Sequence, residues 1–91
     1  MESGRLGAST QPVRLPGGER ALLIVGIEDG SAAATGGLPV GDVLQSWNGE
    51  ALLTPQDLLG RVLHSAHQTV QLGVLRGGQL VSLDVTSRAR A

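Results

Sequence analysis

The pattern of apolar and polar positions predicts an edge strand followed by a buried strand near the start of the chain. Residues 6–13 alternate weakly and carry polar side chains on one face, through Ser9 and Gln11, as a half-exposed strand does. Residues 21–27 form a continuous apolar run of strand length, which favours a central strand covered on both faces. Pro16-Gly17-Gly18 lies between these segments and separates them.

Four further strands are predicted in two pairs. Residues 43–47 and the short segment 50–53 flank Asn48-Gly49, a dipeptide that tolerates the positive φ angles of a tight reversal. Residues 70–75 and 80–85 alternate at period two on either side of a Gly-Gly pair. This arrangement predicts a hairpin.

Two helices are predicted between the strands. Ser31 can cap a single helical turn over residues 32–35, which Gly36-Gly37 ends. The second helix begins at Thr54-Pro55-Gln56-Asp57, because this segment combines a capping hydroxyl, Pro at the first helical position and an acid three residues later. It extends to about Ser65.

The second helix carries apolar residues on more than one face. Leu58 and Val62 are spaced to face the core, whereas Leu59 and Leu63 face elsewhere. Gly60 lies inside the helix, where it costs roughly 1 kcal/mol relative to Ala. Its presence indicates backbone mobility or close packing on that side.

The elements together predict a mainly β protein of the α+β class. Two short helices and five or six strands without βαβ alternation favour a small, partly open β-barrel capped by the helices. The 91 residues leave room for one domain. We expect its core at about residues 4–86, with residues 87–91 as a frayed tail or the start of a linker.

Composition excludes several function classes. Seven Arg or Lys residues against eight acids leave a formal charge of −1, and no block of like charge suggests nucleic acid as a partner. Without cysteine there are no disulfides, so the compartment stays undecided. The apolar runs are far shorter than the roughly 20 residues of a membrane span, and residues 1–10 lack the apolar core of a signal peptide.

A long stretch of the chain resembles bacterial PDZ domains. Val25 to Ala34, Leu38 to Leu44 and Trp47-Asn48-Gly49-Glu50 follow one another as strand, acidic turn, alanine-rich helical turn, Gly-Asp corner and a strand that ends in Asn-Gly. The resemblance covers residues 4–85 and is closest to the PDZ domains that follow the catalytic domain of HtrA/Deg-type serine proteases. It implies a PDZ-like barrel with the protease-type strand order, and a domain that binds peptides and catalyses nothing.

The start of the chain carries the candidate binding site. Successive N–H groups in a tight turn form a concave anion site, Gly permits the dihedral angles, and an edge strand offers unpaired groups to an extended peptide. The resemblance implies that Arg5-Leu6-Gly7-Ala8 receives the terminal carboxylate of a peptide, whose apolar side chain enters a pocket closed by the second helix. The candidate peptide-binding residues are Arg5, Leu6, Gly7, Ala8, Ser9, Thr10, Leu59, Val62 and Leu63.

Each of these assignments has a plainer alternative. A small apolar residue beside Gly, as at Leu6-Gly7, is also common in ordinary turns. Helix statistics alone favour Leu59 and Leu63 as core residues. Arg5 can attract a carboxylate, but an exposed arginine is more often solvated surface, and an exposed pair contributes only about 0.2 to 1 kcal/mol.

Three departures from the family pattern bear on the ligand. Ala8 stands where the family usually carries a bulkier apolar residue, and Arg5 replaces a frequent aromatic residue. The connection over residues 14–20 is shorter than usual, which leaves the groove more exposed or marks an edited sequence. The preferred peptide is therefore left open.

Catalysis and metal binding are not expected of this chain. It contains neither Gly-x-Ser-x-Gly nor a Gly-rich nucleophile loop, and Ser31 already serves as a helix cap. His64 and His67 lack a third nearby ligand, whereas zinc sites need three or four protein ligands. No cofactor is expected.

Three functions remain open. The leading hypothesis is the substrate-binding or regulatory PDZ domain of an HtrA-like serine protease, with peptide or unfolded-protein C-termini and the parent protease domain as partners. The resemblance also implies an extracytoplasmic location, no direct membrane insertion, and oligomerisation only through the parent protein. The alternatives are a PDZ domain of another bacterial protease or secretion component, and an assembly module without a peptide ligand, whose edge strand pairs with another subunit.

Overall fold

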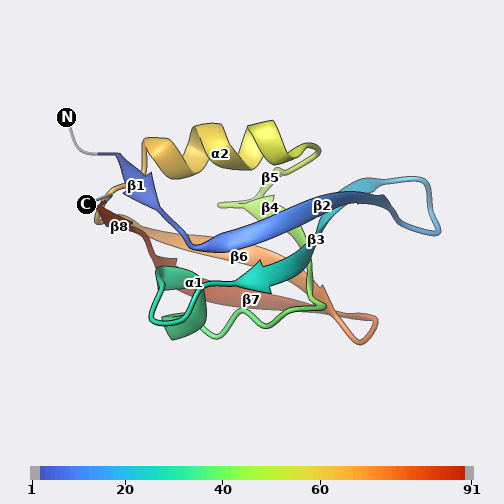
Figure 1. Ribbon diagram of the computed structural model, residues 1–91. Coiled ribbons are helices and arrows are strands. Elements are labelled where there is room, and N and C mark those ends of the chain that lie inside the picture. Colours follow the sequence, from blue (N-terminus) through green and yellow to red (C-terminus); the bar gives the residue numbers. More distant parts are fainter. Residues whose placement is uncertain (1–2, 90–91) are drawn as a thin grey trace.

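The computed structural model describes residues 3–89 and contains two helices among short and long strands (Figure 1). The elements are β1 (Gly4–Arg5), β2 (Ala8–Arg14), β3 (Arg20–Ile27), α1 (Ala32–Thr35), β4 (Val43–Trp47), β5 (Glu50–Ala51), α2 (Pro55–Leu63), β6 (Thr69–Arg76), β7 (Gln79–Thr86) and β8 (Arg88–Ala89). The predicted strands and helices are all present, with ends that shift by a few residues. The chain is mainly β with two short helices, as the sequence predicts.

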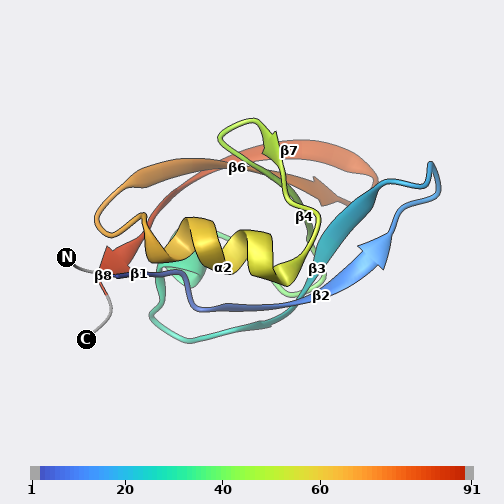
Figure 2. The same ribbon diagram turned by 90° about the horizontal axis from the view of Figure 1, so that it is seen from above.

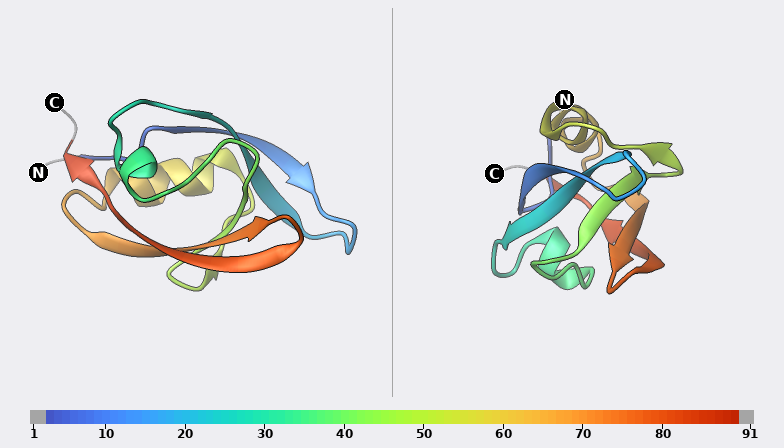
Figure 3. Two further views of the ribbon diagram at one scale, coloured as in Figure 1. Left: turned by 90° about the horizontal axis from the view of Figure 1, so that it is seen from below. Right: turned by 90° about the vertical axis from the view of Figure 1, so that its right-hand side faces the viewer.

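The main sheet is antiparallel and open. Its strand order is β2-β3-β4-β6-β7, with β5 paired to β4 off this path. The sheet curves around the core (Figure 3) without closing into a barrel, because β2 and β7 are its two ends and do not pair with each other. The predicted edge position of the first long strand is confirmed.

A β-bulge separates the two halves of the β2–β3 pair. Ser9 pairs with Gly26 and Thr10 with Ile24, so Val25 has no partner on β2. Such an extra residue turns the side chains around it, and Val25 is 45% exposed. The prediction that both faces of this strand are covered is therefore right for Leu22 and Ile24, which are fully buried, and wrong at Val25.

Aliphatic side chains from the sheet and α2 form the core. Helix α2 lies across the sheet, beside β2 (Figure 2), and buries Leu58 and Val62 to 6% exposure. Leu22, Leu44, Leu52 and Leu72 are fully buried beneath it. Neither helix of residues 3–89 combines the length and hydropathy of a membrane span.

Side-chain caps define where the helices begin. Ser31 accepts a hydrogen bond from the Ala34 amide at 3.2 Å. The hydroxyl of Thr54 accepts from the Asp57 amide at 3.1 Å, and the Asp57 carboxylate accepts from the Thr54 amide at 3.3 Å, which is a capping box. Helix α2 ends at Leu63, two residues earlier than predicted.

The predicted C-terminal tail is wrong for residues 87–89. Ser87 is 2% exposed, and β8 pairs with β1, with Gly4 opposite Ala89 and Arg5 opposite Arg88. The Arg88 guanidinium also donates to the Gly30 carbonyl and to the Thr35 hydroxyl of α1. These long-range contacts order the segment, whereas residues 90 and 91 lie outside the described residues.

Two ion pairs connect elements away from β2. The Asp42 carboxylate is nearly buried and accepts three hydrogen bonds from Arg76, the shortest at 2.7 Å from Nη2, and these bonds raise the pKa of Arg76. Glu50 of β5 accepts from Arg61 of α2 at 3.2 Å, which lowers the pKa of Glu50. Both pairs connect parts of the fold that are distant in the sequence.

Candidate functional site

A groove of about 770 Å³ runs between the start of β2 and α2. One wall is the β1–β2 connection with the first residues of β2, and the other is the exposed side of α2. The end of β3 borders it as well. Its lining residues are Arg5, Leu6, Gly7, Ala8, Ser9, Thr10, Gly26, Ile27, Glu28, Pro55, Leu58, Leu59 and Val62.

The groove is apolar where β2 faces α2. Leu6 is only 4% exposed and forms part of the core, and Ala8 packs against that core. Leu58 and Val62 contribute from α2, while Leu59 is 52% exposed at the rim. An aliphatic side chain of a ligand can therefore replace water against aliphatic walls.

Eight of the nine predicted binding residues line this groove, and Leu63 does not. Strand β1 packs against the last turn of α2, where a Cβ on Gly4 would lie 2.1 Å from the Val62 carbonyl oxygen. Leu63 is the final residue of α2 and is not among the residues that line the groove. Its role in closing the pocket stays a prediction.

The sequence reasoning missed five lining residues. Gly26, Ile27 and Glu28 come from β3 and the turn after it, and Pro55 and Leu58 come from α2. The sequence predicts Pro55 at the helix start and Leu58 on the core face of α2, but it does not predict that both residues also border the groove. The β3 residues could have been found only from the register of β2 on β3, which includes the bulge.

Gly7 gives the loop before β2 its shape. Its φ is +82°, and a Cβ there would lie 2.3 Å from the Cβ of Ser31, so both the dihedral and the packing require Gly. The Leu6 carbonyl accepts from the Ala33 amide at 2.9 Å and the Gly7 carbonyl from the Glu28 amide at 2.8 Å. These two hydrogen bonds hold the Leu6 and Gly7 carbonyls pointing into the fold and away from the groove.

The amides of this loop are available to a ligand. Within residues 3–89, no acceptor takes a hydrogen bond from the Leu6 or Gly7 amide. Consecutive free N–H groups around a glycine with positive φ form an anion-binding concavity. A terminal carboxylate is one anion of suitable size.

Ala8 presents its backbone to the open edge of the sheet. Ala8 pairs with Ile27, and the bond from the Glu28 amide to the Gly7 carbonyl flanks this pair. In an antiparallel ladder that arrangement makes Ala8 and Ile27 a non-hydrogen-bonded pair, so the N–H and C=O of Ala8 point away from β3. They can pair with an added strand.

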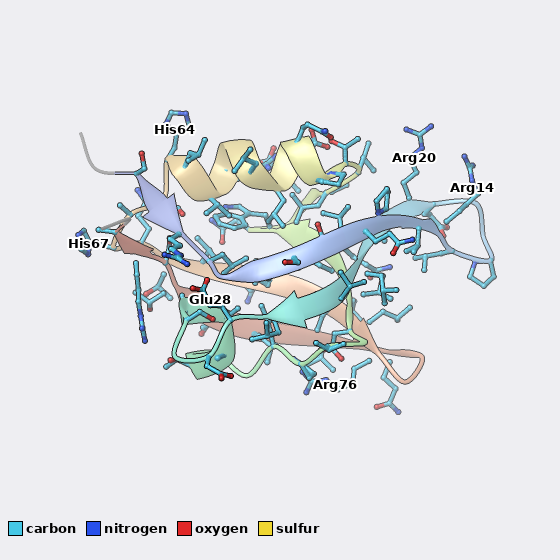
Figure 4. All side chains as sticks on the ribbon, in the orientation of Figure 1. Arg14, Arg20, Glu28, His64, His67 and Arg76 are labelled. Carbon is cyan, nitrogen blue, oxygen red and sulfur yellow. The ribbon has the colours of Figure 1, made fainter. Side chains whose placement is uncertain are left out.

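Arg5 does not offer a free positive charge to the groove. Its guanidinium binds both carboxylate oxygens of Glu28, which lies beside the β1–β2 connection (Figure 4). Both side chains are about half exposed, at 47% and 54%. The predicted attraction of Arg5 for a ligand carboxylate is thus opposed by an acid of the protein.

The histidines lie outside the groove. His64 caps the end of α2, and His67 lies in the turn that follows, with φ +64°. Among residues 3–89, no three side chains of the His, Cys, Asp or Glu types come together as a metal site would require.

Comparison with known proteins connects this geometry to a family. A family profile described as "PDZ domain" matches residues 4–86. A search of curated proteins finds no match.

Solved structures give a consistent likeness. The HtrA-type protease AlgW with a decapeptide is 25% identical, with a TM-score of 0.87 over 99% of this chain and 30% of that one. The serine endoprotease from Yersinia pestis is 19% identical, with a TM-score of 0.84 over 99% and 30%. The HtrA3 PDZ domain bound to a phage-derived ligand (FGRWV) is 18% identical, with a TM-score of 0.83 over 99% and 89%. The chain thus spans about a third of the length of the two proteases.

Proposed function

The chain belongs to the PDZ domain family, and on that premise we propose that its groove binds a peptide in an extended conformation by strand addition to β2. A PDZ domain is a binding module, and the protease domain of the HtrA-type neighbours has no counterpart in these 91 residues. The ligand is a hydrophobic C-terminus or an extended apolar segment. Its carboxylate or backbone carbonyl meets the amides of Leu6, Gly7 and Ala8.

The observation that supports this proposal is that an open strand edge, an anion site and an apolar pocket lie together at the start of β2. The outward-facing backbone of Ala8 provides strand pairing, the loop amides of Leu6 and Gly7 provide an anion site, and α2 provides an apolar pocket. An extended peptide uses all three at once, because its backbone, terminus and alternate side chains point in these directions.

The expected affinity for a short peptide is modest. A short flexible peptide loses conformational freedom on binding and gains few anchors, so we expect a dissociation constant of about micromolar order. Leu6, Ala8, Leu58 and Val62 line the groove with aliphatic side chains, which suit an apolar side chain of the ligand.

The domain itself serves a longer protein. We assign it to the substrate-binding or regulatory part of an HtrA-like serine protease outside the cytoplasm, where it captures the termini of unfolded proteins. The likeness to AlgW over 99% of this chain supports that assignment. In this arrangement residues 4–86 act as one domain, and any oligomer forms through the parent protein.

Calorimetric titration with a short peptide that ends in Val tests the proposal. Leu59→Asp places a charge on the groove rim without opening the core, because Leu59 is already 52% exposed, and should weaken binding at least about tenfold. Leu80→Asp is the matched control, since Leu80 is 72% exposed on β7 and outside the groove. Equal affinities for the two variants, or no heat with the unmodified chain, would rule out this groove as the site.

A further inference from the structure

Of the described residues that line the groove, two are charged, and they bind each other. Arg5 enters from the β1–β2 connection, and Glu28 follows β3. The Arg5 guanidinium contacts both oxygens of the Glu28 carboxylate. The pair therefore brings no net charge to the loop that would receive a peptide terminus.

Glu28 is held beside that loop by the backbone. Its amide donates to the Gly7 carbonyl at 2.8 Å, and its Cβ lies 3.5 Å from where a Cβ on Gly7 would stand. The backbone and Cβ of Glu28 are thus held beside Gly7 by the sheet register. Its carboxylate is held in turn by Arg5.

This position affects carboxylates and uncharged ligands differently. A ligand carboxylate at the loop amides meets an arginine already bound to an acid. It must compete with Glu28 for the Arg5 guanidinium, so it gains little attraction from that charge. An internal peptide segment or an amidated terminus carries no charge there and does not depend on Arg5.

We propose that Glu28 determines specificity: by holding Arg5 and cancelling its positive charge beside the loop, it reduces the preference of the groove for free C-termini over uncharged peptide backbone. This inference rests on the proposed peptide binding and names the residue that sets its specificity.

The test compares one apolar peptide as the free acid and as the C-terminal amide. For each protein variant, calorimetry gives the ratio of the two affinities. Glu28→Gln keeps the backbone bond to Gly7 but removes the charge, so the acid-to-amide ratio should rise about two- to fivefold, the range of an exposed ion pair. A ratio that stays the same or falls would overturn the proposal.

Two further variants isolate the cause. Asp29→Asn removes the same charge from the next residue, which is exposed and outside the groove lining, and should leave the ratio within error. In an Arg5→Gln background, Glu28→Gln should raise the ratio less than in the unmodified chain. A full rise in that background, or an equal rise with Asp29→Asn, contradicts the role of the pair.

The result also separates this inference from the proposed function. If neither peptide form binds the unmodified chain, peptide binding fails and this inference fails with it. If both forms bind and the ratio is insensitive to residue 28, only the specificity assignment is wrong.

Discussion

At the scale of single residues, Gly7 connects backbone geometry to binding. Its positive φ turns the loop so that the Leu6 and Gly7 carbonyls bond to the protein and the amides stay available. Ser31 fills the space on the other side, and it also caps α1. The requirement for glycine at position 7 therefore comes both from the loop conformation and from the packing of Ser31 at the start of α1.

Gly7→Ala should lower both stability and peptide affinity. An alanine at this φ costs about 1–2 kcal/mol. Its Cβ would also lie 2.3 Å from the Ser31 Cβ, so Ser31 would have to move. The free energy of unfolding comes from urea denaturation and the affinity from calorimetry.

Gly18→Ala is the control, because Gly18 has φ +91° with no atom within 4 Å of an added Cβ. It carries the dihedral cost alone and lies in the distant β2–β3 turn. Undiminished affinity in Gly7→Ala, or equal losses of affinity in the two variants, would refute the role of the loop.

At the scale of elements, the groove exists because β2 is an edge and α2 does not cover it. Helix α2 packs Leu58 and Val62 inward and leaves Leu59 at the rim, so one helix serves core and groove. The capping box at Thr54 fixes where this helix starts, and the last turn of the helix contacts β1.

Gly60→Ala should stabilise α2. A Cβ at Gly60 would meet no atom within 4 Å, so of the two explanations for this glycine, close packing is excluded among the described residues. Alanine inside a helix is favoured by roughly 0.5–1 kcal/mol over glycine, and urea denaturation should give an increase of that size.

Gly4→Ala provides the contrast, because its Cβ would lie 2.1 Å from the Val62 carbonyl oxygen, a backbone atom that cannot rotate away, and this variant should be less stable than the unmodified chain. A Gly60→Ala variant less stable than the unmodified chain would mean that α2 requires glycine for a reason outside helix propensity.

At the scale of the whole molecule, local signals could be predicted from the sequence and long-range pairings could not. Strand periods and helix caps are local, so the elements were predicted, and the loop before an edge strand indicated Arg5 to Thr10. The rotation of α2 on the sheet is set by tertiary packing, so the sequence places Leu63 at the groove and Leu58 in the core alone, whereas the groove lining includes Leu58 and not Leu63. The Arg5–Glu28 and β1–β8 contacts depend on register across many residues, which no periodicity reveals.

The exchange rate of the Ala8 amide, measured by NMR with and without peptide, tests strand addition most directly. The free amide faces the open edge of the sheet, whereas the Ile24 amide is bonded to the Asp42 carbonyl at 2.9 Å and serves as the internal reference. A saturating peptide that ends in Val should slow exchange at Ala8 at least about tenfold. Unchanged exchange at Ala8 with the peptide bound would contradict strand addition to β2.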